Sequence, residues 1–183
     1  MSDISERYVR IAGIFSDRVH AVPAQAWDNP SPCEDWTARD VVGHLTGWIQ
    51  PFFSSQGVEF PAVPSVDDDP AGAWDVVQAV IANALADFDF AARQLDTPLG
   101  RQSFAETVDT LVIPEMFTHG WDLSRATGQS DLLDPEQLQR MIAGMGALPE
   151  EVMRAPGMFG PRIEVPGGVD DQTRFLAYVG RRA

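Results

Sequence analysis

The chain has 183 residues, 44% hydrophobic and 22% charged, a composition typical of one soluble globular domain. Its formal net charge of −14, with only 13 scattered basic residues, argues against nucleic acid and anionic membranes as partners. All 13 are arginines and Cys33 is the single cysteine, which excludes Schiff-base lysine chemistry, a P-loop lysine, an internal disulfide and a cysteine-rich zinc site.

Two amphipathic helices are predicted in the first third of the chain. Apolar residues recur in steps of three and four over residues 4–19, which indicates a helix. A proline-rich loop is expected over residues 21–36. Thr37 and Asp40 then form the capping-box pattern of a second helix. Pro51 is expected to end or bend this helix near its C-terminus.

Two further helices are predicted after a long polar connection. Residues 57–72 are rich in proline and aspartate, which suggests a crossover or a lid over a site. A third helix is expected over residues 71–95, followed by a short turn at 96–100. A fourth is expected over residues 104–128. Because no strand alternation or internal repeat is visible, these segments predict an all-α fold, a four-helix bundle.

The last third of the chain predicts two shorter helices, at 134–145 and 171–179, separated by a segment (155–168) dense in glycine and proline. We expect this partly helical C-terminal tail to pack on the bundle rather than to form a second domain.

We expect one domain over residues 1–183, with a core bundle (1–128) and a C-terminal extension (129–183). No apolar run approaches the ~20 residues that a membrane-spanning helix needs. Residues 1–10 lack the pattern of a signal peptide. We therefore expect a cytoplasmic protein without a membrane partner.

One face of the predicted fourth helix changes from apolar to polar along its length. Its second half places Glu115, His119 and Asp122 where leucine or valine is expected. Pro114 removes one backbone donor and is expected to kink the helix just before Glu115. Polar groups on a buried stripe are costly unless they are compensated. A metal ion is one compensation and a buried Glu–His hydrogen bond is another, and the spacing alone favours neither.

A third core-facing candidate lies on the predicted second helix. His44 shares the apolar face of that helix, and bundle cores build metal sites from inward-pointing His and carboxylate side chains. Together with Glu115 and His119 it forms a two-His-one-carboxylate set, which suits Zn²⁺ with an open position, or Fe²⁺, Ni²⁺ or Mn²⁺. His20 lies at a helix end, where the helix dipole favours a cationic imidazole, and is left out of the predicted ligand set.

Two segments of the sequence resemble a known family. PSPCEDWTARDVVGHLTGW (30–48) and EMFTHGWDLSRATG (115–128) resemble the DinB-like superfamily, more closely its branch around the mycothiol-dependent maleylpyruvate isomerase N-terminal domain. In the tail, MFGPRIEV (158–165) and FLAYVGRR (175–182) resemble an actinobacterial subgroup described only as metal-binding.

The resemblance implies a four-helix bundle that holds one divalent metal, usually Zn²⁺ or Ni²⁺, with three side chains. The matching positions are His44, Glu115 and His119. It also implies thiol-dependent isomerase or transferase chemistry with mycothiol or bacillithiol, and it is consistent with a homodimer. The isomerase itself carries a separate C-terminal domain that this chain is too short to contain. The resemblance therefore does not imply maleylpyruvate as the substrate.

Two residues near the predicted ligands keep alternative interpretations. Asp122 either orients the second ring nitrogen of His119, as an outer partner of a metal ligand, or pairs with Arg125 or Arg101. Cys33 is either a reactive thiol near a helix N-terminus or a small apolar residue that fills a turn.

The sequence leaves three functional hypotheses. The first is an enzyme in which a metal ion activates a low-molecular-weight thiol toward a small electrophile, with Arg181 or Arg182 helping to bind an anionic substrate. No catalytic residue is assigned. The second is a metal-binding or stress-response module without turnover. The third is a plain bundle in which Glu115 and His119 only pair with each other.

Overall fold

The computed structural model describes residues 3–146, 150–154 and 159–183. They fall into two compact units, Met1–Asp131 and Leu132–Ala183. These residues are mostly helical and include one small two-stranded sheet, which confirms the all-α prediction. Across the described ranges, no helix combines the length and apolar character that crossing a membrane requires.

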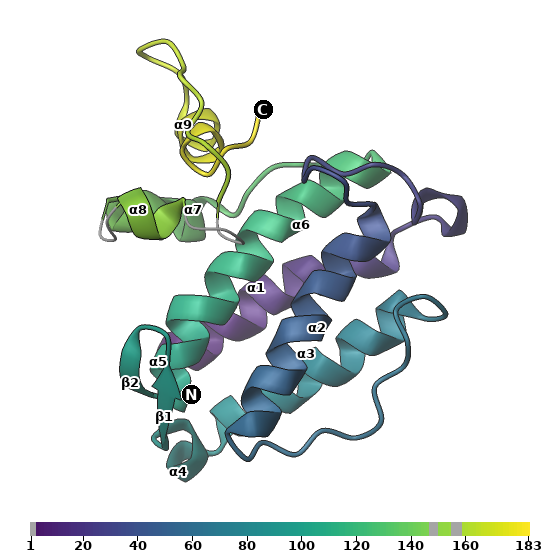
Figure 1. Ribbon diagram of the computed structural model, residues 1–183, viewed down its shortest axis with the longest axis vertical. Coiled ribbons are helices and arrows are strands. Elements are labelled where there is room, and N and C mark those ends of the chain that lie inside the picture. Colours follow the sequence, from purple (N-terminus) through teal and green to yellow (C-terminus); the bar gives the residue numbers. More distant parts are fainter. Residues whose placement is uncertain (1–2, 147–149, 155–158) are drawn as a thin grey trace. The chain divides into compact units, whose positions relative to one another are not determined.

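Four long helices form the first unit (Figure 1). They are α1 (Asp3–His20), α2 (Ala38–Ser55), α3 (Pro70–Ala86) and α6 (Ile113–Thr127). Both α3 and α6 contact α1 and α2, so each helix has two neighbours around one core. Phe15 and Trp74 meet edge to face in that core, with ring centroids 4.7 Å apart. The predicted four-helix bundle is confirmed.

The predicted capping box fixes the start of α2, the helix that carries His44. Thr37 Oγ1 accepts a hydrogen bond from the backbone nitrogen of Asp40 at 3.2 Å, and Asp40 Oδ2 accepts one from the backbone nitrogen of Thr37 at 2.8 Å. These two bonds satisfy donors that the first turn of a helix leaves unpaired. Pro51 does not end the helix, which continues to Ser55.

Replacing the cap is expected to destabilise the bundle measurably. Thr37→Ala removes the acceptor for the backbone nitrogen of Asp40 and is expected to lower the free energy of unfolding by about 1 kcal/mol. Urea unfolding followed by circular dichroism measures this change. Thr37→Ser keeps the hydroxyl and serves as the control. An equal loss in both variants would show that the hydroxyl does not stabilise the helix.

The predicted third helix is wrong beyond Ala86, because α3 ends there. The side chain of Asp87 accepts hydrogen bonds from the backbone nitrogens of residues 89 and 90 and caps the short helix α4 (Phe88–Ala91) instead. Aspartate favours such caps over helix interiors because its carboxylate offers the backbone an alternative partner.

The turn expected at residues 96–100 is part of a strand pair that the sequence did not predict. The segments β1 (Gln94–Thr97) and β2 (Gly100–Ser103) pair as an antiparallel hairpin, with Gln94 opposite Ser103. Both strands are short and mostly polar, with only Leu95 buried, so they lack the alternation by which strands are recognised in a sequence.

The predicted fourth helix is interrupted by one wide turn. The segment runs through α5 (Phe104–Thr107), a π-helical turn η2 (Val108–Val112) and α6. Buried Arg7 of α1 donates to the carboxylate of Asp109 in this turn and ties it to the neighbouring helix. Pro114 follows this turn without a break in the helical run, and its ring and missing donor act on the carbonyl of residue 110, inside the turn. The irregularity therefore lies just before Glu115, where Pro114 is expected to disturb the helix.

The described residues of the second unit form three short helices. They are α7 (Pro135–Gly144), α8 (Glu150–Met153) and α9 (Asp171–Tyr178). The predicted helices of the tail correspond to α7, which contacts α9, and to α9 itself, whereas α8 was not predicted. Residues 155–158 of the predicted Gly- and Pro-rich segment lie outside the described residues, and 159–168 contain no helix or strand. The packing of the tail on the bundle stays a prediction.

Candidate metal centre

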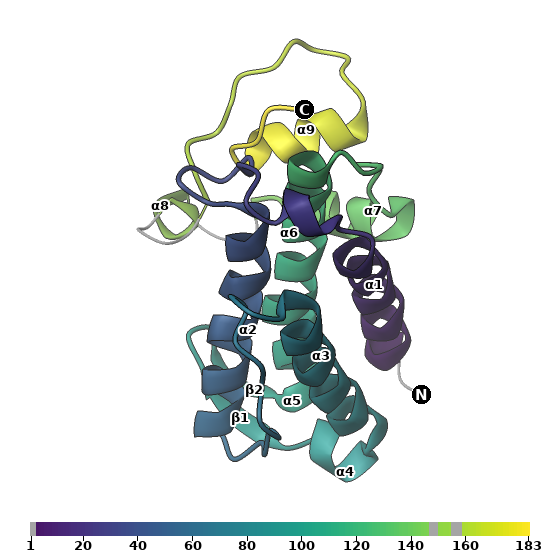
Figure 2. The same cartoon turned by 90° about the vertical axis from the view of Figure 1, so that its right-hand side faces the viewer.

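The three predicted ligand side chains lie together, with their ligand atoms within 4.8 Å of one another. They come from α2 and α6, two helices that pack side by side (Figure 2). Nε2 of His44 is 2.9 Å from Oε2 of Glu115, and Nε2 of His119 is 3.3 Å from the same oxygen. The side chains of His44 and Glu115 are 31% and 28% exposed, whereas that of His119 is 8% exposed. The cluster therefore has a closed side at His119 and an open side at His44.

Helix geometry explains how the sequence brings these groups together. Glu115 and His119 are four residues apart on α6, one turn from each other on the same face. His44 lies on the first half of α2, which packs against α6. The spacing that singled out these three residues therefore corresponds to real proximity, and their use as metal ligands stays a proposal, taken up below.

The second ring nitrogen of His119 also has a partner. Nδ1 of His119 is 2.9 Å from Oδ2 of Asp122, a carboxylate with no exposed surface. The thiol of Cys33 donates to the same oxygen at 3.3 Å, and its sulfur lies 3.9 Å from Nδ1 of His119. The sequence did not place Cys33 at this contact, because its position depends on the path of a loop rather than on helix periodicity.

A tight loop, residues 30–37, brings aromatic and sulfur groups to the cluster. Its two ends form an isolated β-bridge. At its tip Asp35 has φ 62°, a left-handed conformation that is uncommon outside glycine and tends to occur at functional sites. Trp36 stacks on His119 with ring centroids 5.6 Å apart and tilts over His44 at 4.8 Å. The loop therefore covers the two imidazoles.

Hydrogen bonding determines the charges of the cluster. Burial acts to raise the pKa of Glu115, but the bonds from His119 and His44 outweigh it and lower this pKa to about 2. Burial acts to lower the pKa of His119, but the bonds to Asp122, Cys33 and Glu115 raise it well above its ordinary value. Without a metal ion, Glu115 is thus ionised and His119 protonated at neutral pH.

The donor set fits a divalent ion. Two imidazole nitrogens converge on one carboxylate, which is the composition of catalytic two-His-one-carboxylate sites. Histidine ligands of metals usually donate their other ring N–H to a carboxylate, which is the position of Asp122. A bound ion would take the place of the proton that His119 directs at Glu115.

Arg125, one of the two arginines considered for Asp122, and the remaining histidine each have another carboxylate partner. Arg125 pairs with Asp131 at 3.0 Å. His20 is 51% exposed and lies 3.0 Å from Asp75. Among the described residues, His20 belongs to neither of the two groups of candidate metal ligands.

The two tail arginines belong to the second unit. Arg181 donates to the backbone oxygen of Val179. Their expected role in binding an anionic substrate stays a prediction.

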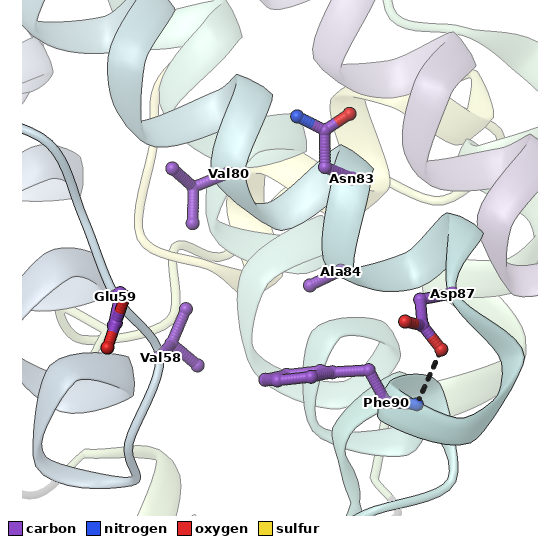
Figure 3. A pocket seen from close by; sticks show the side chains of 7 residues that line it. All are labelled: Val58, Glu59, Val80, Asn83, Ala84, Asp87 and Phe90. Atoms are coloured by element: carbon purple, nitrogen blue, oxygen red, sulfur yellow. Dashed lines mark hydrogen bonds between the residues drawn. The ribbon is translucent and has the colours of Figure 1, made fainter.

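A cavity of about 300 Å³ opens in the first unit away from the candidate ligands (Figure 3). It is lined by side chains of α3, α4 and the segments flanking them, namely Val58, Glu59, Val80, Asn83, Ala84, Asp87 and Phe90. A second hollow lies near the hairpin and is lined by Phe88, Gln94, Ser103 and neighbouring residues. Neither lining includes His44, Glu115 or His119.

Sequence comparison decides the family. Residues 9–124, more than half of the chain and including all three candidate ligands, match the mycothiol maleylpyruvate isomerase N-terminal domain. The chain belongs to this family. Membership confirms the resemblance noted in the sequence and gives the protein a mycothiol-related domain.

Two curated proteins are similar to this chain over most of its length. Two proteins of Mycobacterium tuberculosis, from strains CDC 1551 and H37Rv, are each 29% identical to it over 175 residues, which cover 94% of both chains. Both are named only as uncharacterized proteins. No solved structure matches the chain.

Proposed function

We propose that this domain binds one divalent ion, Zn²⁺ in the first place, through His44, Glu115 and His119, and activates a low-molecular-weight thiol for transfer or isomerisation. The observation that carries the proposal is that Nε2 atoms of two imidazoles converge on Glu115. His119 is buried, whereas His44 and Glu115 are partly exposed. Three protein ligands leave at least one coordination position for an exogenous group.

The chain's own residues perform distinct parts in this chemistry. Asp122 holds the proton of His119 on Nδ1, so that Nε2 faces the centre. Trp36 covers the two imidazoles and limits access of water from that side. His44 and Glu115 border the open side, where both side chains remain partly exposed to solvent. A bound divalent ion would supply the charge that keeps a coordinated thiol deprotonated near neutral pH.

The nucleophile is expected to come from outside the chain. The sequence has no lysine and a single cysteine, and the thiol of that cysteine donates a hydrogen bond to Asp122. The family's description names mycothiol, a low-molecular-weight thiol. A thiol cosubstrate therefore supplies the group that the domain lacks, and the second substrate is a small electrophile.

A non-catalytic metal-binding module is the second candidate. One observation favours it: neither of the cavities described above borders His44, Glu115 or His119, so neither offers a substrate pocket at the candidate centre.

Turnover distinguishes the two candidates. Metal-loaded protein is incubated with mycothiol and a panel of electrophiles that includes maleylpyruvate and haloaromatics, and thiol consumption is followed. We expect turnover with the native protein and only the background rate with His44→Ala, because this variant lacks one proposed ligand. His20→Ala, which changes a surface imidazole, is the matched control. Native rates no higher than those of His44→Ala across the whole panel would favour the non-catalytic module.

A further inference from the structure

We propose that Cys33 is a positioning residue of the candidate metal centre. Its thiol donates to Asp122 and thereby holds this carboxylate against Nδ1 of His119. The inference rests on the function proposed above, because it takes His119 as a metal ligand.

The contacts of Asp122 are the first support. Cys33 and His119 come from segments that are 86 residues apart, yet both direct a proton at the same oxygen, Oδ2, at 3.3 and 2.9 Å. The carboxylate has no exposed surface. A buried carboxylate is stable only when donors surround it, so each donor contributes to keeping Asp122 in place.

The orientation of His119 is the second support. A neutral imidazole carries its proton on one ring nitrogen and offers a lone pair on the other. Asp122 accepts at Nδ1, which directs the lone pair of Nε2 toward His44 and Glu115. If Asp122 is displaced, it therefore no longer fixes which ring nitrogen of His119 carries the proton, and it no longer fixes the orientation of the ring.

The backbone around Cys33 is the third support. The backbone nitrogen of Cys33 donates to Oγ of Ser31 at 3.2 Å, and its backbone oxygen accepts from the nitrogen of Trp36 at 3.1 Å. Asp35 adopts its left-handed conformation between them. These bonds fix the direction of the thiol, which a residue that only fills a turn does not require.

Direct binding of a cation by Cys33, His119 and Asp122 is an alternative role for these residues, and it predicts a different result. The sulfur of Cys33, Nδ1 of His119 and a carboxylate oxygen of Asp122 lie within 4.8 Å of one another and could themselves hold a cation. In that arrangement the sulfur is a thiolate ligand, whereas positioning requires a thiol that donates a proton. Serine keeps a donor but is a poor substitute for a thiolate ligand, so Cys33→Ser separates the two roles.

The test compares Cys33→Ala with Cys33→Ser. Zinc affinity is measured by competition with a chromophoric chelator. We expect Cys33→Ala to bind zinc about 10- to 100-fold more weakly, the range for loss of an outer partner of a ligand, and Cys33→Ser to stay close to the native protein. In metal-free protein, NMR follows the N–H proton on Nδ1 of His119. It should exchange slowly in the native and serine proteins and faster in the alanine protein.

Three outcomes would overturn the positioning role. The first is a Cys33→Ala protein that keeps both native zinc affinity and slow exchange at Nδ1 of His119. The second is an equal loss in the serine and alanine proteins. The third is a thiolate-to-cobalt charge-transfer band in cobalt-loaded native protein that Cys33→Ser abolishes. If native protein binds no ion at all, the proposed function fails, and the exchange of the Nδ1 proton still decides the role of Cys33.

Discussion

Protein purified without a tag is expected to contain about one divalent ion per chain, and His44→Ala and His119→Ala are each expected to remove it. The two imidazoles and Glu115 form one cluster, so loss of either imidazole leaves only two of three proposed ligands. The affinity should fall by more than about 100-fold, beyond the range typical of outer partners. Elemental analysis of the native protein and both variants measures the effect.

His20→Ala is the matched control for this prediction, because His20 lies on the surface beside Asp75 and outside the cluster. Metal content should be unchanged in this variant. A chelator should also lower the melting temperature of the native protein, since an ion present at 100 times its dissociation constant stabilises the folded state by about 2.7 kcal/mol. Full metal content in both cluster variants would show that the proposed site is wrong.

The metal-free protein is expected to lose stability as the pH rises above about 6.5, while its affinity for zinc increases over the same range. The pKa of His119 is raised in the folded state by Asp122, Cys33 and Glu115. A raised pKa contributes stability that is fully present below the unfolded value, about 6.5, and is lost as the pH rises through the folded value. The slope is at most about 1.4 kcal/mol per pH unit for one proton.

At acid pH, the contribution of Glu115 to the stability of the protein changes with pH in the opposite direction. The pKa of Glu115 is lowered to about 2, so its contribution is present above the unfolded value of 4.5 and is lost as the pH falls toward 2. Zinc competes with the proton on Nε2 of His119, so each proton displaced makes binding up to about tenfold tighter per pH unit.

Urea unfolding of the metal-free protein from pH 2 to 9, and of the protein with excess zinc from pH 5 to 9, measures these trends. His119→Gln should remove most of the alkaline loss of stability in the metal-free protein, and His20→Ala should leave it unchanged. A metal-free native protein whose stability does not depend on pH between 6.5 and 9 would contradict the proton assigned to His119.

Much of the fold follows from local patterns in the sequence. The capping box at Thr37, the stop at Gly128 and the apolar spacing of α1 depend on contacts within one or two turns. The end of α3 could not be read in this way. Apolar residues continue to Leu95, but the side chain of Asp87 caps a new short helix after Ala86. The hairpin that follows is stabilised mainly by backbone pairing, which leaves no periodic trace.

In the candidate site, too, some features follow from local sequence patterns and others do not. His44, Glu115 and His119 were found because helical spacing places polar groups on otherwise apolar faces. The contact between Cys33 and Asp122 depends on how residues 30–37 fold back, and no pattern in a single sequence encodes that path. The charge of His119 could not be predicted from the sequence either, because it depends on Glu115 and Asp122 of the same helix and on Cys33 of the loop.

The wide turn at Val108–Val112 and the helix after it differ in how well they tolerate the loss of one residue. A π-helical turn holds one residue more than an α-helical turn, so the loss of one residue there would leave regular helix with both flanking faces in place. The loss of one residue between Glu115 and His119 would rotate one of them by about 100° around the helix axis and separate the pair. Length variation among relatives can therefore accumulate at the turn while the pair beyond it keeps its spacing.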